Sequence, residues 1–210
     1  MSKYGNIVWI ALVGSIWGAV ELFGGDLFRA WGVPHKSALL FSLALLIMYA
    51  SKRICEAAGS TIIMGLIAAA FKTVSDHFYP CQVAAIMINS IIFESAYLYL
   101  RQKFAVSLAV RTIAAPIITY ISYTLFAFVA TYLIRQENWV DGGVGGIIDY
   151  LTSSAVFASL LSLLTINLGH SAGEKIRRSV FIRQTNFALN YLKIVMAALA
   201  LAIWITGLRY

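Results

Sequence analysis

The stretch NIVWIALVGSIWGAVELFGG, residues 6–25, decides the fold class of this chain. It is apolar over most of its length, and a helix of about 20 such residues crosses a hydrocarbon core of about 30 Å. Its glycines and its one carboxylate, Glu21, interrupt the uniform apolar region that a secretory signal would carry. We therefore interpret it as a retained transmembrane helix, with an acid placed in a segment suited to lipid.

The composition extends this interpretation to the whole chain. Of its 210 residues, 60% are hydrophobic and 12% charged, whereas a soluble domain has roughly 45–50% apolar and about 25% charged residues. The sequence predicts an all-α polytopic transmembrane helical bundle that forms one domain, residues 1–210. Spans are expected at 6–25, 37–51, 57–75, 81–100, 112–134, 145–169 and 188–208. The second and third runs are short, so the bundle has six or seven spans, six if one of these runs is interfacial or re-entrant.

Basic residues orient this bundle. Sixteen Lys and Arg stand against nine Asp and Glu, and because they cluster in short loops they fit the positive-inside rule better than a nucleic-acid surface. No nucleic-acid partner is expected. With a cytoplasmic N-terminus, most of them fall on the cytoplasmic side: Lys3, Lys52, Arg53, Arg101, Lys103, Arg111, Lys175, Arg177, Arg178, Arg183 and Lys193. The basic loop EKIRRSVFIRQ, 174–184, would then face anionic membrane lipid or a cytoplasmic partner.

Small residues form a stripe on the first span. Ala11, Gly14, Gly18, Glu21 and Gly25 recur at spacings of three or four, so on a helix they share one face. Small residues at this spacing let another helix approach closely in lipid, where hydrophobicity does not drive helices together. The stripe is therefore a packing surface, either for a helix of this chain or for a partner.

Charged side chains near the outer ends of the spans are the first binding candidates. Glu21 lies beside Trp17, and because a charge at the bilayer centre costs at least about 2.5–3.5 kcal/mol, it should face a polar cavity, a partner or a ligand unless it reaches the wet interface. Lys72 either pairs with Asp76 at i, i+4 or offers a cation to a carboxylate or phosphate. Trp31 lies in the outer loop 25–36, where the aromatic interfacial belt is the alternative.

The fourth and sixth runs add further polar groups. Asn89 and Glu94 lie in the fourth run, and Glu94 is interpreted as a structural hydrogen-bond acceptor to another span, or else as a proton carrier. Asp149 lies below RQENWVDGGVGG, 135–146, which we expect to be a flexible outer loop that acts as a lid. The outer loops and these runs together predict a polar, aromatic-lined pocket that opens outward. Its candidate substrate-binding residues are Trp17, Glu21, Trp31, Lys72, Asn89 and Asp149.

Motifs for chemistry are not found in the sequence. It has no P-loop, no HExxH and no serine elbow. His35, His77 and His170 lie in or next to loops, so paired intramembrane haem ligands are not available. Cys55 and Cys81 have neither CxxC nor metal-ligand spacing. We therefore expect no metal, no cofactor and no enzyme activity.

The size, the basic-inside bundle, the segment ALVGSIWGA at 11–19 and the outer loop after it resemble the substrate-binding S components of energy-coupling factor (ECF) transporters. The resemblance implies a prokaryotic inner (cytoplasmic) membrane, a transmembrane coupling subunit and ATPase subunits as partners. It also implies that Trp17, Glu21 and Trp31 line the pocket. The implied docking surface consists of Ala11, Gly14, Ser15, Gly18 and Ala19.

Three functions remain open at this point. The first is a substrate-capture subunit of an ATP-driven importer, which binds a small metabolite or vitamin from the outer face. The second is a non-catalytic accessory or anchoring subunit of a larger membrane complex, either redox or lipid-handling. The third, an intramembrane enzyme, would use Glu94 or Asp149 as acid or base. The sequence names neither the substrate nor its charge.

Overall fold

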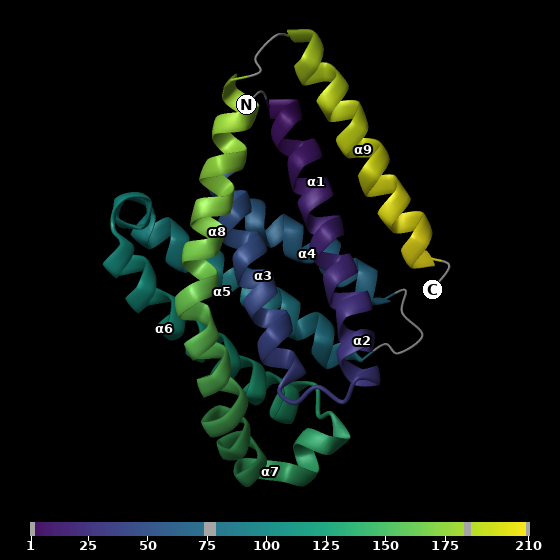
Figure 1. The fold of residues 1–210 in the computed structure, drawn as a ribbon. Helices are drawn as coiled ribbons and strands as arrows, with labels where there is room; N and C mark the ends of the chain where they lie inside the picture. Colours follow the sequence, from purple (N-terminus) through teal and green to yellow (C-terminus); the bar gives the residue numbers. More distant parts are fainter. Residues whose placement is uncertain (1–2, 74–78, 183–185, 209–210) are drawn as a thin grey trace.

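The computed structural model in Figure 1 describes residues 3–73, 79–182 and 186–208, which are helical apart from short connections. Short π-helical turns extend three of the helices, at Val20–Gly24, Val129–Leu133 and Leu151–Ala155. The α-helices are α1 (Lys3–Ala19), α2 (Gly25–Ala30), α3 (Lys36–Ile54), α4 (Ser60–Thr73), α5 (Pro80–Val106), α6 (Leu108–Phe128), α7 (Glu137–Tyr150), α8 (Val156–Ile182) and α9 (Asn186–Leu208).

The helices confirm the predicted class, an all-helical protein with membrane-spanning segments. Within the described residues, five helical segments are long and apolar enough to cross a membrane: Asn6–Ala30, Lys36–Ile54, Pro80–Ala105, Leu108–Leu133 and Glu137–Ser179. Two further apolar helices, Ser60–Thr73 and Ile194–Gly207, are shorter. Each of the seven predicted runs thus contains a helix, but the predicted count of six or seven crossings exceeds the five that meet both length and composition.

The bundle is organised around α8 and α3. In Figure 1, α8 runs along nearly the full height of the molecule and α7 lies across the lower end. α3 and α6 both pack along α8, α1 packs on α4 and α9, and α4 packs on α5. The largest enclosed side chains include Trp17, Tyr49, Phe93 and Phe104. This core therefore joins α1, α3 and α5 around aromatic rings.

Glycines mark where helices approach most closely. A Cβ added at Gly14 would lie 2.9 Å from Cβ of Ile67, and one at Gly18 would lie 2.7 Å from the Phe71 ring, both on α4. Ser15, which is 1% exposed, accepts a 3.2 Å hydrogen bond from Nε1 of Trp204 on α9. The stripe of the first span is thus a packing surface within the chain.

This packing limits the surface that the docking residues expected from the resemblance leave accessible. A coupling subunit would need exposed surface on the stripe, but Gly14, Ser15 and Gly18 are buried. Only Ala11 and Ala19 of the expected docking residues are half-buried. The small residues at spacings of three and four allow any helix to approach closely. Helices α4 and α9 belong to the same chain as α1, and they occupy this surface.

The segment 135–146, predicted as a glycine-rich loop, is largely helical. α7 begins at Glu137, whose negative charge in the first turn favours a helix N-terminus. The helix breaks at Gly143, where φ is 51° and ψ is −144°, and then continues into α8. The predicted outer loop 25–36 is also partly helical. Helix α2 continues from α1 and the π-helical turn as far as Ala30, and the chain turns only at 31–35.

The connection between α5 and α6 is shorter than expected. The sequence predicts no span over 101–111, whereas α5 reaches Val106 and α6 begins at Leu108. Ser107 breaks the helix, and its hydroxyl accepts a 3.2 Å hydrogen bond from the Val110 amide. This N-cap allows two long helices to follow each other with a single residue between them.

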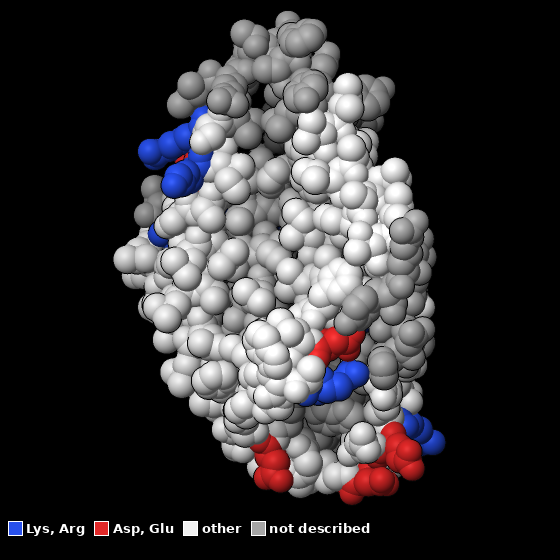
Figure 2. All heavy atoms as spheres, turned by 45° about the vertical axis from the view of Figure 1, so that its right-hand side comes forward, with Lys and Arg blue, Asp and Glu red and all other residues white. Residues whose placement is uncertain are grey.

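Charged side chains gather at the two ends of the molecule. On the face shown in Figure 2, the described basic and acidic atoms lie toward the upper and lower ends, and the described atoms in the zone between them belong to uncharged residues. This zone corresponds to the apolar middle of the spanning helices. The distribution is that of an integral membrane protein, because charged groups are costly within the hydrocarbon core.

A polar cavity between the helices

A cavity of about 170 Å³ lies between the segment 20–30, which follows α1, and helices α3, α4, α5, α6 and α7. Its described lining combines charged, amide, hydroxyl and aromatic side chains with a few aliphatic ones. Ligand pockets commonly measure roughly 300–1,000 Å³, so this one suits a small molecule. Arg29 and Lys36 line it and are exposed, which places them at its rim.

Glu21 reaches the cavity from the π-helical turn Val20–Gly24. Such turns rotate the side chains that follow them relative to a regular helix and are frequent at functional sites. The Glu21 side chain is 9% exposed, and its Oε1 accepts a 3.1 Å hydrogen bond from Nε1 of Trp17. In the described part of the chain, no donor binds its other oxygen, Oε2.

Lys72 reaches the cavity from the last turn of α4. It is 5% exposed. A Cβ added at Gly25 would lie 3.5 Å from its Nζ, so the ammonium group lies against the first residue of α2. No described residue forms a hydrogen bond or an ion pair within 4.0 Å with it. Asp76, its predicted i+4 partner, lies outside the described residues.

Aromatic rings form another wall. Tyr123 of α6 and Tyr150 of α7 stack with centroids 5.2 Å apart and an interplanar angle of 20°. Trp139 packs edge-on against Tyr150 at 4.8 Å and against Phe126 at 5.3 Å. Phe41 of α3 meets Tyr123 edge-on at 5.4 Å. Phe41, Tyr123, Phe126 and Tyr150 of this cluster line the cavity and give it an aromatic side.

Two buried polar atoms at the cavity have no partner within the described residues. They are Oε1 of Gln82 and the hydroxyl of Tyr123, a residue 4% exposed, which the Ser37 side chain approaches outside good hydrogen-bond geometry. Both residues line the cavity. Buried polar groups are nearly always hydrogen-bonded, so these atoms are available to a bound molecule or to water.

The structure brings together four of the six predicted binding residues. Glu21, Lys72 and Asn89 line the cavity. Trp17 is fully buried and does not line it, but it donates a hydrogen bond to Glu21. Trp31 is 69% exposed and follows the end of α2, where the interfacial-belt alternative fits it.

Asp149 is exposed and does not line the cavity, unlike the next residue, Tyr150. Successive helical residues point about 100° apart, and the sequence does not show which of the two faces inward. Tyr123 and Gln82 also line the cavity but are not among the six predicted binding residues. Their only sequence signal is a polar group within an apolar run.

Glu94 belongs to a different polar centre, near the α3–α4 connection. Its Oε1 accepts hydrogen bonds from Nζ of Lys52 at 2.8 Å and from the Gly59 amide at 2.7 Å. Its Oε2 accepts one from the Thr61 amide at 3.3 Å. Lys52 is 0% exposed and also donates to the Ala57 carbonyl at 2.8 Å. The expectation that Glu94 is an acceptor to another span is confirmed.

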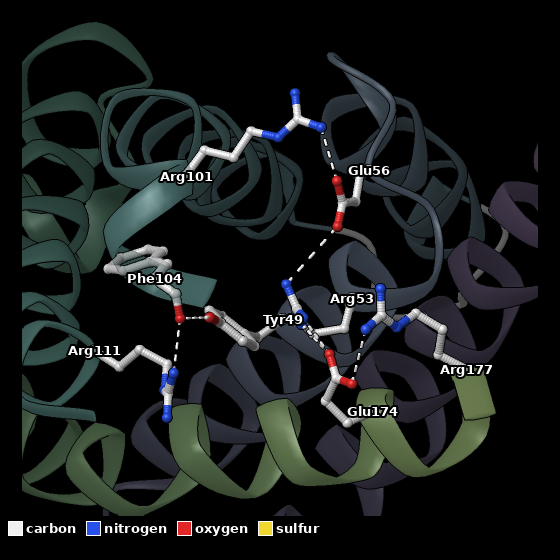
Figure 3. A network of polar contacts seen from close by, with 8 residues as sticks. All are labelled: Tyr49, Arg53, Glu56, Arg101, Phe104, Arg111, Glu174 and Arg177. Atoms are coloured by element: carbon white, nitrogen blue, oxygen red, sulfur yellow. Dashed lines mark hydrogen bonds and ion pairs between the residues drawn. The ribbon is translucent and has the colours of Figure 1, made fainter. Parts of the chain in front are cut away.

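A network of ion pairs surrounds the same end of the bundle (Figure 3). Arg53 of α3 binds Glu174 of α8, which also accepts from Arg177 at 3.0 Å. Arg53 lies 3.8 Å from Glu56, which pairs with Arg101 of α5 at 2.7 Å. The network joins α3, α5 and α8 at the end opposite the cavity.

The described residues contain no group of three or more His, Cys, Asp or Glu side chains placed to hold a metal ion. No known protein family, curated protein or solved structure matches the sequence. The fold and the cavity therefore define the class of this protein by themselves: a helical membrane protein with a polar cavity among its helices.

Proposed function

We propose that this chain is a membrane-embedded substrate-capture subunit of an ATP-driven importer, of the energy-coupling factor kind. It binds a small metabolite at the outer face and passes it to a transmembrane coupling subunit and ATPase subunits. The observation that carries the proposal is the cavity, where a buried carboxylate and a buried ammonium group face the same space without an ion pair between them among the described residues. The chain itself performs no chemistry on the metabolite.

The position of the cavity supports uptake from outside. The described basic residues Lys52, Arg53, Arg101, Arg111 and Arg177 lie at the other end of the helices. By the positive-inside rule, that end is cytoplasmic, together with the N-terminus. If the shorter helices α4 and α9 also cross, the chain has seven spans. The cavity then opens away from the cytoplasm, in the inner membrane of a prokaryote.

Docking of a coupling subunit must use what the bundle leaves accessible on α1. The half-buried Ala11 and Ala19 flank Ile16, which is 38% exposed. These residues offer a small apolar contact surface. The buried members of the stripe become accessible only if their neighbours move away from α1: α4 covers Gly14 and Gly18, and α9 contacts Ser15.

Native mass spectrometry of the protein, gently extracted from its own membrane, tests this function. The expected result is a retained small molecule together with an ATPase-bearing complex. Stable partners without ATPase activity and without a bound metabolite would refute capture and identify an accessory or anchoring subunit. Turnover of a metabolite by the isolated chain would refute it in favour of an enzyme.

A further inference from the structure

The cavity also indicates the chemistry of its ligand, an inference that rests on the proposed capture function. Its charges come first. Among the described lining residues, Arg29, Lys36 and Lys72 are cationic and Glu21 is the one carboxylate. Arg29 is 3.5 Å from Asp26, which offsets its charge. The remaining net charge of the lining is positive, and Lys72 is its most deeply buried cation. The cavity therefore favours an anionic group.

Lys72 is the anchor for that group. Its ammonium lies in a side chain only 5% exposed and lacks a hydrogen bond or close ion pair with any described residue. Burial of an ammonium ion is costly unless it is paired. The carboxylates of Glu21 and Asp26 act on this charge from a distance, and a ligand carboxylate at Nζ supplies the direct, charge-assisted hydrogen bond.

Glu21 requires the opposite chemistry. Trp17 donates to Oε1, while Oε2 has no described donor and the residue lines the cavity. The unpartnered Gln82 Oε1 is a second acceptor at the same cavity. Two acceptors without donors favour an N–H group on the ligand.

The aromatic wall sets the shape. Stacked Tyr123 and Tyr150, with Phe126 beside them, present ring surfaces to a space of about 170 Å³. Ring pairs prefer offset or edge-on packing at centroid distances of about 4.5–7 Å. We propose that the ligand is a small planar ring compound that carries a carboxylate and an N–H group. The carboxylate binds Lys72, the N–H group binds Glu21, and the ring lies along the tyrosines.

The three aminobenzoates test this inference, with benzoate and aniline as comparators that each lack one of the two groups. Binding to the full chain in lipid nanodiscs is measured by isothermal titration calorimetry. At least one aminobenzoate should bind on the order of tenfold more tightly than either comparator, because each comparator leaves one charged group unpaired. Equal binding of all the compounds would overturn the inference.

Substitutions assign each group of the ligand to its residue. Lys72→Met should weaken binding of aminobenzoate and benzoate but leave aniline unchanged. Glu21→Gln, which keeps an acceptor for Trp17, should reduce the advantage of aminobenzoate over benzoate. Lys103→Met, at an exposed position far from the cavity, is the matched control. Unchanged benzoate binding by Lys72→Met would overturn the assignment of the carboxylate.

A readout on the native chain covers the case that Lys72→Met fails to fold. Cys81 lines the cavity, whereas Cys55 is 1% exposed elsewhere. Aminobenzoate should slow alkylation of Cys81 by iodoacetamide more than aniline does, and the reverse order would overturn the inference. If native mass spectrometry finds a bound metabolite without a carboxylate, the inference about the chemistry of the ligand is wrong, but the proposed capture function is supported. If no metabolite is retained and no probe binds, both fail.

Discussion

Lys52 and Glu94 show how single residues place charge inside a bundle. Both side chains are buried, at 0% and 2% exposed, and the carboxylate binds two backbone amides as well as the ammonium. The Lys52 Nζ also lies 5.1 Å from the Tyr97 ring centroid. Because each polar atom has partners, the pair joins α3, α4 and α5 without leaving a free charge.

Removal of one partner should therefore be costly. Lys52→Met leaves Glu94 buried with no cation, and breaking a buried pair in this way costs about 3–5 kcal/mol. Thermal unfolding in detergent micelles measures the loss, with exposed Lys103→Met as the control. Adding Glu94→Gln to Lys52→Met should restore part of the stability, because the amide oxygen still accepts from the backbone amides. A double variant no more stable than Lys52→Met would contradict this account.

Arg111 is a second buried cation with hydrogen-bond partners, and its side chain is 7% exposed. Its NH1 donates to the Phe104 carbonyl at 2.7 Å, and its Nε donates to Asn167 at 3.2 Å. Arg111→Met should lower the free energy of unfolding by about 1.5–3 kcal/mol, the usual range for a hydrogen bond to a charged group. Arg101, 52% exposed in its pair with Glu56, is the matched control, and Arg101→Met should leave the melting temperature nearly unchanged because solvent screens exposed pairs. Equal losses would show that burial does not set the strength of these contacts.

At the scale of elements, glycine pairs hold the helices together. Gly169 and Gly173 of α8 face α3, where added Cβ atoms would lie 2.7 Å from the Leu46 carbonyl oxygen and 2.6 Å from that of Ala50. Gly14 and Gly18 play the same part between α1 and α4. Since lipid is as apolar as leucine, close packing of backbones is a main source of helix association in membranes. At all four glycines, an added Cβ would lie less than 3.0 Å from an atom of the neighbouring helix.

A methyl group at Gly173 should open one of these contacts. Gly173→Ala places a Cβ against backbone rather than against a movable side chain, and overpacking of this kind costs about 1–3 kcal/mol. Gly145→Ala is the control, because nothing lies within 4 Å of its Cβ position. Unfolding of both variants in micelles gives the difference. A Gly173→Ala variant as stable as the native chain would show that α3 and α8 can separate freely.

The whole molecule has two chemically different ends. One contains the cavity, with Glu21 and Lys72 facing it. The other contains the ion-pair network of Figure 3, centred on Arg53 and Glu174. Between them, the faces of the bundle carry apolar side chains, and Ile113 and Leu133 are 64% and 77% exposed. Exposed apolar surface of this extent is expected of a lipid-facing protein and not of a soluble one.

The proposed orientation follows from these ends and can be measured in intact cells. In a background in which Cys55 and Cys81 are replaced by Ala, Asp141→Cys should react with a membrane-impermeant maleimide added outside. Glu56→Cys should react only after the membrane is permeabilised, because it lies at the basic end. Both positions are accessible to some degree, so burial alone does not distinguish them. The opposite labelling pattern would reverse the topology and place the cavity on the cytoplasmic side.

The sequence by itself determined the class of protein, the positions of its seven apolar helical runs and several of its costly polar groups, although not α2 or most of α7. These follow from local physical requirements: a span needs about 20 apolar residues, and an acid or a lysine inside one must have a reason to be there. Glu21, Lys72 and Asn89 were found in this way, and each lines the cavity.

Only the tertiary structure decided which way each helix faces. In a soluble protein, apolar periodicity marks the buried side, but in lipid both sides of a helix are apolar, and the pattern is lost. Tyr150 thus faces the cavity while Asp149 does not, and the glycines of the first span are covered by α4 of the same chain. The pairing of helices is a property of the folded bundle, because it depends on close contacts between residues far apart in the sequence.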